Sequence, residues 1–274
     1  MIRELDKIIS KLTVRLKDVT DNRYIGTGVI YCSDELKEKV YIITASHCLF
    51  IDGDDFQQQR EEVFVDILQK DFIDYQSIKV AVNPDLLFKD KKKDIAILSI
   101  DKKEIENILG ETPKIKVVKE KSIYKNFIVK GFPQATFGEE IAVLYPDWLQ
   151  TIDTRFQLQL KEDYTAYNTK GFSGSGVFIN AEKDIFLYGI FTRFRAEEKG
   201  KVIYSQFLDI TNELLTKNYL PLIRFTYFGG YGLTQNFFRK QIETSITGLG
   251  SRFSEELNFQ LPHSHKANPA IQYR

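Results

Sequence analysis

Short apolar runs separated by clusters of glycine, aspartate, asparagine or lysine fill most of the chain from Thr13 to Tyr204. Such runs between turn-forming residues are typical of β-strands. One charged segment, Asp101–Leu109, is helix-prone and is followed by Gly110 and Pro113, which is the pattern of a helix stop. Because this segment divides the strands into two groups, we expect an all-β body made of two small barrels or sandwiches.

The strand pattern recurs throughout both groups. The first group comprises the predicted strands Thr13–Lys17, Tyr24–Tyr31, Val40–Thr44, Val63–Leu68, Ile78–Val82 and Ile95–Ile100. The second comprises Ile115–Val118, Phe127–Gly131, Ile141–Leu144, Phe156–Leu160, Gly176–Ile179, Ile185–Phe194 and Val202–Tyr204. Helical spacing of apolar residues then predicts an amphipathic helix over Ser205–Asn218.

These elements predict one domain over residues 1–219, with barrel one at about 13–105, barrel two at about 115–204 and a C-terminal helix at 205–218. The composition changes from Leu220 onward, where aromatic residues, glycines and a further helical pattern follow one another. We expect residues 220–274 to form a mixed helical extension or linker.

The charge balance argues against two classes of partner. Lys plus Arg and Asp plus Glu both number 38, so the formal net charge is zero. Nucleic-acid binders and polybasic membrane binders need a concentrated cationic surface, so we expect neither a nucleic acid nor a membrane as partner. The hydrophobic share of 43%, with 21 Phe and 14 Tyr, is enough for a packed core.

The N-terminus and the cysteines favour a cytoplasmic protein. Acidic Glu4 and Asp6 stand where a secretory signal would be apolar, and no run approaches the roughly 18 apolar residues of a membrane span. Cys32 and Cys48 are too few for a disulfide scaffold and match no zinc pattern. We expect reduced thiols, with a Cys32–Cys48 pair across a hairpin as the open alternative.

The body of the chain holds one histidine, His47, because the other two of the three are His263 and His265 near its end. His47 follows an apolar strand, Asp94 opens another strand, and Ser173 lies in a glycine-rich turn. A serine hydroxyl becomes a nucleophile when an imidazole takes its proton and a carboxylate orients that imidazole. These three residues are therefore the candidate catalytic triad.

The glycines around Ser173 let successive amides point at one spot, as an oxyanion hole requires. We expect the amides of Gly171 and Ser173 to be its donors. Chemistry of this kind needs no cofactor and no metal, and we predict neither.

Three short sequence motifs, in the order His, Asp, Ser, resemble those of the trypsin-like, chymotrypsin-fold serine peptidases. The first two are Thr44-Ala45-Ser46-His47-Cys48, close to that family's T-A-A-H-C, and Asp94-Ile95-Ala96-Ile97-Leu98, which matches its D-I-A-L-L. The third is Gly171-Phe172-Ser173-Gly174-Ser175, which matches its G-D-S-G-G with two changes. The resemblance extends from about Thr13 to Asn218.

This resemblance implies two six-stranded antiparallel β-barrels and an intracellular serine endopeptidase that cleaves proteins or peptides. It assigns substrate binding to Tyr167, Asn168, Thr192, Arg193 and Phe194. None of the aligned pocket positions is acidic, which argues against a preference for Lys or Arg. An arginine at 193 or 195 would favour an acidic side chain, and Phe194 would narrow the pocket.

Two departures from the family pattern bear on activity. Phe172 replaces the aspartate that receives a newly cleaved N-terminal amine in the secreted enzymes, so that route of activation is absent. Ser175 replaces a glycine beside the oxyanion turn. These changes keep open the alternative of a catalytically inactive pseudo-protease that binds a peptide or a protein partner.

The segment Leu249–Pro262 resembles the junction between an N-terminal effector and a STAND-type NTPase sensor in bacterial anti-phage systems. It implies antiviral defence, with a peptidase held latent until a sensor or other partner activates it. Two charged segments, Asp52–Asp55 and Lys89–Lys93, are expected to be solvated loops.

Overall fold

The computed structural model describes residues 2–119, 126–160, 169–181, 184–197 and 200–226. The described residues belong to one compact unit, Met1–Thr226. Residues 227–274 lie outside the described residues, and they include most of the predicted extension over 220–274 and the segment that resembles a STAND-type junction.

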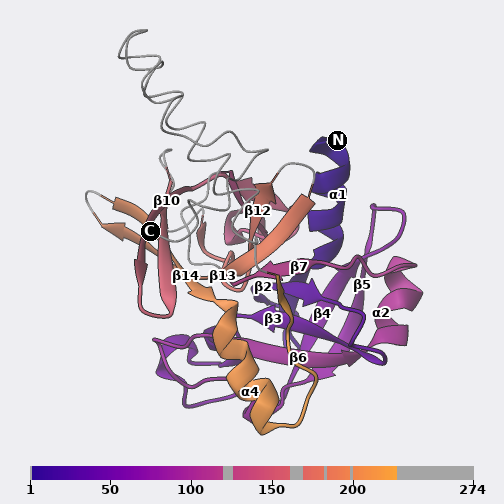
Figure 1. Ribbon diagram of the computed structural model, residues 1–274. Helices are drawn as coiled ribbons and strands as arrows, with labels where there is room; N and C mark the ends of the chain where they lie inside the picture. Colours follow the sequence, from indigo (N-terminus) through magenta and orange to yellow (C-terminus); the bar gives the residue numbers. More distant parts are fainter. Residues whose placement is uncertain (1, 120–125, 161–168, 182–183, 198–199, 227–274) are drawn as a thin grey trace, which may run out of the picture. The chain divides into compact units, whose positions relative to one another are not determined.

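The first sheet is a curled antiparallel sheet of six strands in the order β5-β4-β1-β2-β3-β6 (Figure 1). Six is the number of strands that the sequence predicted for this sheet. Its strands are β1 (Thr13–Asp18), β2 (Tyr24–Tyr31), β3 (Lys39–Thr44), β4 (Glu62–Leu68), β5 (Tyr75–Ala81) and β6 (Ala96–Asp101). Short 3-10 turns at η1 (Ser46–Leu49), η2 (Gly53–Asp55) and η3 (Pro84–Leu86) lie in its connections.

The second sheet has nine strands rather than the six expected. Seven antiparallel strands run in the order β10-β11-β14-β13-β12-β8-β9, and the short strands β7 and β15 add parallel pairs next to β13. Its strands are β7 (Lys116–Val118), β8 (Phe127–Gly131), β9 (Ala142–Leu144), β10 (Asp147–Ile152), β11 (Arg155–Gln159), β12 (Gly176–Ala181), β13 (Asp184–Glu197), β14 (Gly200–Phe207) and β15 (Phe225–Thr226). A 3-10 turn, η4 (Gln134–Thr136), follows β8.

Two helices, α1 and α2, flank the sheets. The linking helix α2 (Lys102–Leu109) lies where the sequence predicted it and ends at Gly110 with φ +79°. The N-terminal helix α1 (Ile2–Leu12) buries Ile9 in the core, and its Asp6 carboxylate accepts a 2.6 Å bond from the Lys130 ammonium on β8. The helix thereby contacts both sheets, because Lys130 belongs to the second one.

The C-terminal helix begins later than expected. Strand β14 continues through Phe207, the turn η5 (Leu208–Ile210) follows, and α4 covers Thr211–Lys217 instead of 205–218. Ser205 pairs with Phe191 and Phe156 on the two neighbouring strands, so strand pairing overrides the helical spacing there.

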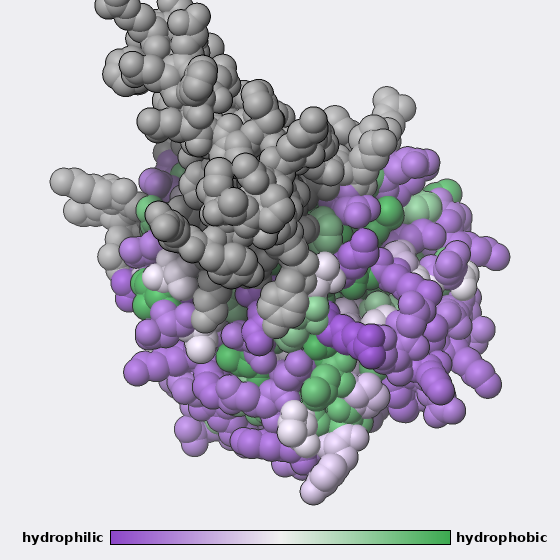
Figure 2. Space-filling view, in the orientation of Figure 1, coloured by the Kyte–Doolittle hydropathy of each residue, from purple (hydrophilic) through white to green (hydrophobic). Residues whose placement is uncertain are grey.

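Strand β10 was missed because most of its side chains are exposed and show no alternation. On the face in Figure 2, hydrophilic residues cover most of the described surface and hydrophobic residues show through in smaller groups. None of the described helices is long and apolar enough to cross a membrane.

Candidate active site

The pairing of β3 with β6 brings His47 and Asp94 together. Thr44, at the end of β3, pairs with Ala96, at the start of the antiparallel β6. The residue that follows one strand and the residue that precedes the other therefore lie at the same end of the sheet. The Ser46 hydroxyl donates a 2.6 Å hydrogen bond to the Ile95 carbonyl and fixes the turn that carries the histidine.

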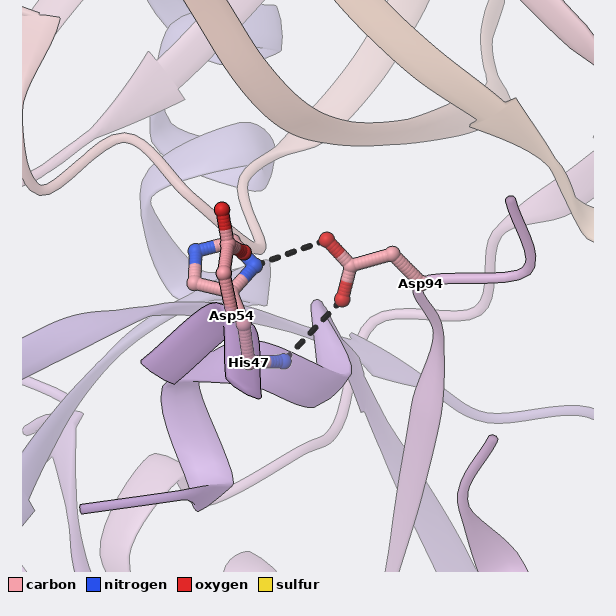
Figure 3. Close-up of side chains that lie close together, drawn as sticks. All are labelled: His47, Asp54 and Asp94. Carbon is pink, nitrogen blue, oxygen red and sulfur yellow. Dashed lines mark hydrogen bonds and ion pairs between the residues drawn. The ribbon is translucent and has the colours of Figure 1, made fainter. Parts of the chain in front are cut away.

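Asp94 holds His47 at two points (Figure 3). His47 Nδ1 lies 2.7 Å from Asp94 Oδ2, within hydrogen-bond distance, and the His47 backbone amide donates to Asp94 Oδ1 at 3.0 Å. The Asp94 side chain is 1% exposed, so this bond is shielded from water. A carboxylate placed in this way fixes the tautomer with the proton on Nδ1 and leaves Nε2 as the basic nitrogen.

The pKa of His47 lies well above the ordinary imidazole value. Burial of the ring lowers the pKa, but the neighbouring Cys48 sulfur and the Asp94 carboxylate raise it by more. The imidazolium is therefore favoured to a higher pH than for a free histidine. A step that needs His47 as a base requires a pH above this raised pKa.

The turn that carries Ser173 is built on two glycines with positive φ, Gly171 at +103° and Gly174 at +89°. The Gly174 amide donates to the Phe191 carbonyl at 2.8 Å, and the Ser175 amide donates to the Phe172 carbonyl at 2.8 Å. These bonds place Ser173 at the beginning of β12, beside β13.

Strand β2 of the first sheet holds the same turn from the other side. The Thr27 amide donates to the Ser173 carbonyl at 2.8 Å, and the Thr27 hydroxyl donates to the Gly171 carbonyl at 2.9 Å. The Tyr24 hydroxyl also donates to the Gly171 carbonyl, and burial raises the pKa of Tyr24 so that the proton stays on. Serine and histidine are thus held on one framework although they come from different sheets.

The two predicted oxyanion donors are the backbone amides of Gly171 and Ser173. Neither the Gly171 amide nor the Ser173 amide donates a hydrogen bond to any of the described residues. The Lys170 carbonyl accepts from the Gln134 amide at 2.7 Å. Because C=O and N–H of a trans peptide point in opposite directions, the Gly171 amide faces away from Gln134.

Gly174 offers a test of how tightly this turn is packed. A Cβ there would clash with the Thr27 carbonyl and the Thr44 hydroxyl, whereas a Cβ at Gly110, also at positive φ, meets no atom within 4 Å. We expect Gly174→Ala to lower the free energy of unfolding by about 3 kcal/mol or more, and Gly110→Ala by only about 1 kcal/mol. Urea unfolding of both variants measures the difference. Equal losses would contradict the close packing of the turn.

The Ser173 hydroxyl donates to the Thr192 carbonyl at 3.2 Å, and no hydrogen bond joins it to His47 in the described part of the chain. Both residues nevertheless line one cleft of about 500 Å³. Of the predicted substrate-binding residues, Thr192, Arg193 and Phe194 line the same cleft. Tyr167 and Asn168 lie outside the described residues.

Asp54 and Arg193 extend the charged network around His47. The Arg193 Nη2 lies 2.7 Å from Asp54 Oδ1 and 3.5 Å from Asp94 Oδ2. Asp54, His47 and Asp94 offer three ligand atoms within 4.8 Å of one another. Figure 3 shows Asp54 beside the imidazole ring. The Arg193 guanidinium lies beside both carboxylates of this cluster and supplies a positive charge to them. The cluster of His47, Asp54 and Asp94 is therefore neutralised by an arginine.

Sequence reasoning missed several residues of this cleft. Asp54 and Lys91 belong to the two charged segments that were expected to be solvated loops, and Arg155 was not singled out. These residues reach the cleft only through strand pairing and loop paths.

Phe172 and Cys48 are both buried beside the turn that carries Ser173. Phe172 is 1% exposed and packs on Phe191 with ring centres 6.1 Å apart, so apolar packing lies beneath the turn. Cys32 and Cys48 are free and buried. A Cβ at Gly26 would lie 2.5 Å from the Cys48 sulfur, so the Cys48 thiol packs closely against β2.

Similar solved structures show which fold this chain has. A thermostable serine protease from an extremophilic microorganism matches with a TM-score of 0.52 and 15% identity, over 75% of this chain and 95% of that one. The serine endoprotease from Yersinia pestis matches with a TM-score of 0.52 and 18% identity, over 79% of this chain and 66% of that one. No protein-family model matches the chain, and no curated protein matches its sequence.

The chain therefore has the fold of the chymotrypsin-like serine proteases. The predicted fold class is confirmed, with the larger second sheet and the later C-terminal helix as corrections to its details. The expected likeness to trypsin-like peptidases is confirmed at the level of this fold.

Proposed function

We propose that the chain is a serine endopeptidase that uses His47, Asp94 and Ser173. The observation that carries this proposal is the buried His47–Asp94 pair, bonded at 2.7 Å and 3.0 Å, in the same cleft as a serine on a glycine turn. A buried carboxylate on Nδ1 of a histidine, facing a serine, suits nucleophilic acyl transfer.

In the proposed reaction, His47 Nε2 takes the Ser173 proton as Oγ attacks the peptide carbonyl. Asp94 stabilises the imidazolium that forms, and the amides of Gly171 and Ser173 bind the oxyanion. His47 then gives its proton to the leaving amine, and a water molecule hydrolyses the acyl-enzyme by the same proton path. The chain's own residues suffice for each step.

We also propose that the described geometry is a resting state. The Ser173 hydroxyl is bonded to the Thr192 carbonyl, and the raised pKa of His47 favours the imidazolium. Substrate backbone added to β13 would compete for the Thr192 carbonyl, and this would release the hydroxyl to turn toward His47. Activation by a cytoplasmic STAND-type sensor or another partner in antiviral defence, as the C-terminal resemblance implied, belongs to the same proposal.

Labelling with a fluorophosphonate tests the proposed nucleophile. Peptide mass mapping should find the label on Ser173 in the wild type and in Ser175→Ala, because Ser175 is buried beside the turn and has no assigned role. Ser173→Ala and His47→Ala should remain unlabelled. A wild type that stays unlabelled during prolonged exposure, with the activating partner present, would favour the alternative of a binding module without catalysis.

A further inference from the structure

The described residues that line the cleft beside His47 and Ser173 carry mostly one sign of charge. They include five cationic side chains and one carboxylate, that of Asp54. The cations are Lys91, Arg155, Lys170, Arg193 and Arg195. Because the chain as a whole has 38 basic and 38 acidic residues, this is a local concentration of positive charge rather than a reflection of composition.

Strand register places three of the cations on one face of the second sheet. Arg193 on β13 pairs with Tyr204 on β14, and Arg195 lies two residues further along β13. Arg155 on β11 pairs with Gln206, which is two residues from Tyr204 on β14. Paired residues and alternate residues of a strand share a face, so the three arginines surround Tyr204 on the face that lines the cleft.

These cations differ in how far they are already neutralised. Arg193 is held by Asp54 at 2.7 Å, so its charge is largely compensated. Lys91, Arg155 and Lys170 form no ion pair with any residue that the structure describes. The Arg195 guanidinium lies 5.8 Å from the centre of the Tyr204 ring, which fixes it against the cleft wall. Among the residues that the structure describes, the positive charge of the cleft without an ion-pair partner therefore lies on Lys91, Arg155 and Lys170.

We propose that this cleft selects acidic peptides, with Arg155 binding the carboxylate of a Glu or Asp side chain. That the ligand is a peptide rests on the proposed endopeptidase function. Guanidinium groups bind carboxylates through paired, charge-assisted hydrogen bonds. A Lys or Arg side chain in the same place would meet like charges, so the cleft both attracts acidic peptides and rejects basic ones.

Peptide selection by the full chain carrying Ser173→Ala tests this proposal without requiring turnover. The immobilised protein is exposed to a library of synthetic decapeptides in which all residue types occur equally, and the retained fraction is sequenced. We expect Glu and Asp to be enriched roughly tenfold or more over Gln and Asn, with Lys and Arg depleted. Retention without acidic enrichment, or no retention, would overturn the proposal.

Charge reversal then tests the assigned residue. Adding Arg155→Glu should abolish the acidic enrichment, whereas Lys70→Glu makes the same charge change at an exposed residue beyond β4 and should preserve it. Melting temperatures show whether each variant folds, and Arg155→Gln replaces a charge-reversed variant that does not. Unchanged enrichment in a folded Arg155 variant would show the assignment to be wrong.

Fluorophosphonate labelling of the wild type separates failure of this proposal from failure of the proposed function. A labelled Ser173 together with unselective peptide retention would leave the endopeptidase standing and overturn the acidic preference. Acidic enrichment without any label at Ser173 would support the acidic ligand and contradict the catalytic function.

Discussion

Replacing Ser173 with alanine should lower kcat by roughly a millionfold, because the nucleophile and the covalent intermediate are lost together. The loss should appear in kcat for a peptide or ester substrate, with little change in melting temperature, since among the described residues the Ser173 hydroxyl makes one hydrogen bond, of 3.2 Å, to the Thr192 carbonyl.

Ser175→Ala is the matched control for this experiment. Its hydroxyl is buried and makes no hydrogen bond with the described residues, so its removal should leave both stability and turnover close to those of the wild type. Cleavage that persists in Ser173→Ala, after correction for trace wild-type protein, would contradict the assignment of the nucleophile.

Replacing Asp94 with asparagine should lower kcat by about ten-thousandfold, because the amide no longer fixes the tautomer or stabilises the imidazolium. Asp94→Asn should also change the pH dependence. Asp94 is one of the groups that raise the pKa of His47, so its removal lowers that pKa.

The sign of the pH effect follows from the proposed role of His47 as a base. In the wild type, kcat/KM should rise with pH through a pKa above 6.5, the ordinary value for the imidazole. In Asp94→Asn the residual activity should rise at a lower pH. Asp85→Asn, an exposed aspartate in the η3 turn, is the control and should leave the profile unchanged. A wild-type limb below 6.5 would contradict the raised pKa of His47.

Much of the fold was predictable because its strands are short, apolar and bounded by turn residues. Tyr24–Tyr31 and Phe127–Gly131 match β2 and β8 residue for residue. Strand β10 was not predictable in this way, because an exposed edge strand has no alternating pattern. The start of α4 was misplaced because Ser205–Phe207 satisfies strand pairing and helical spacing equally well as a sequence.

The residues of the candidate site differ in how visible they are in the sequence. His47, Asp94 and Ser173 each lie in a recognisable short sequence motif, because each occupies a turn directly before or after a strand. Arg155 lies in no such motif, because it reaches the cleft through the pairing of β11 with β14. Its relevance depends on register between distant strands, which a single sequence does not specify.

Trapping the acyl-enzyme tests the central claim most directly. The wild type is mixed with an activated ester substrate, quenched in acid during turnover, digested and examined by mass spectrometry. The proposed mechanism predicts an acyl group on the peptide that contains Ser173, and its absence from that peptide in His47→Ala. Turnover of the ester with no acyl group on Ser173, or with the acyl group on another residue, would contradict the mechanism.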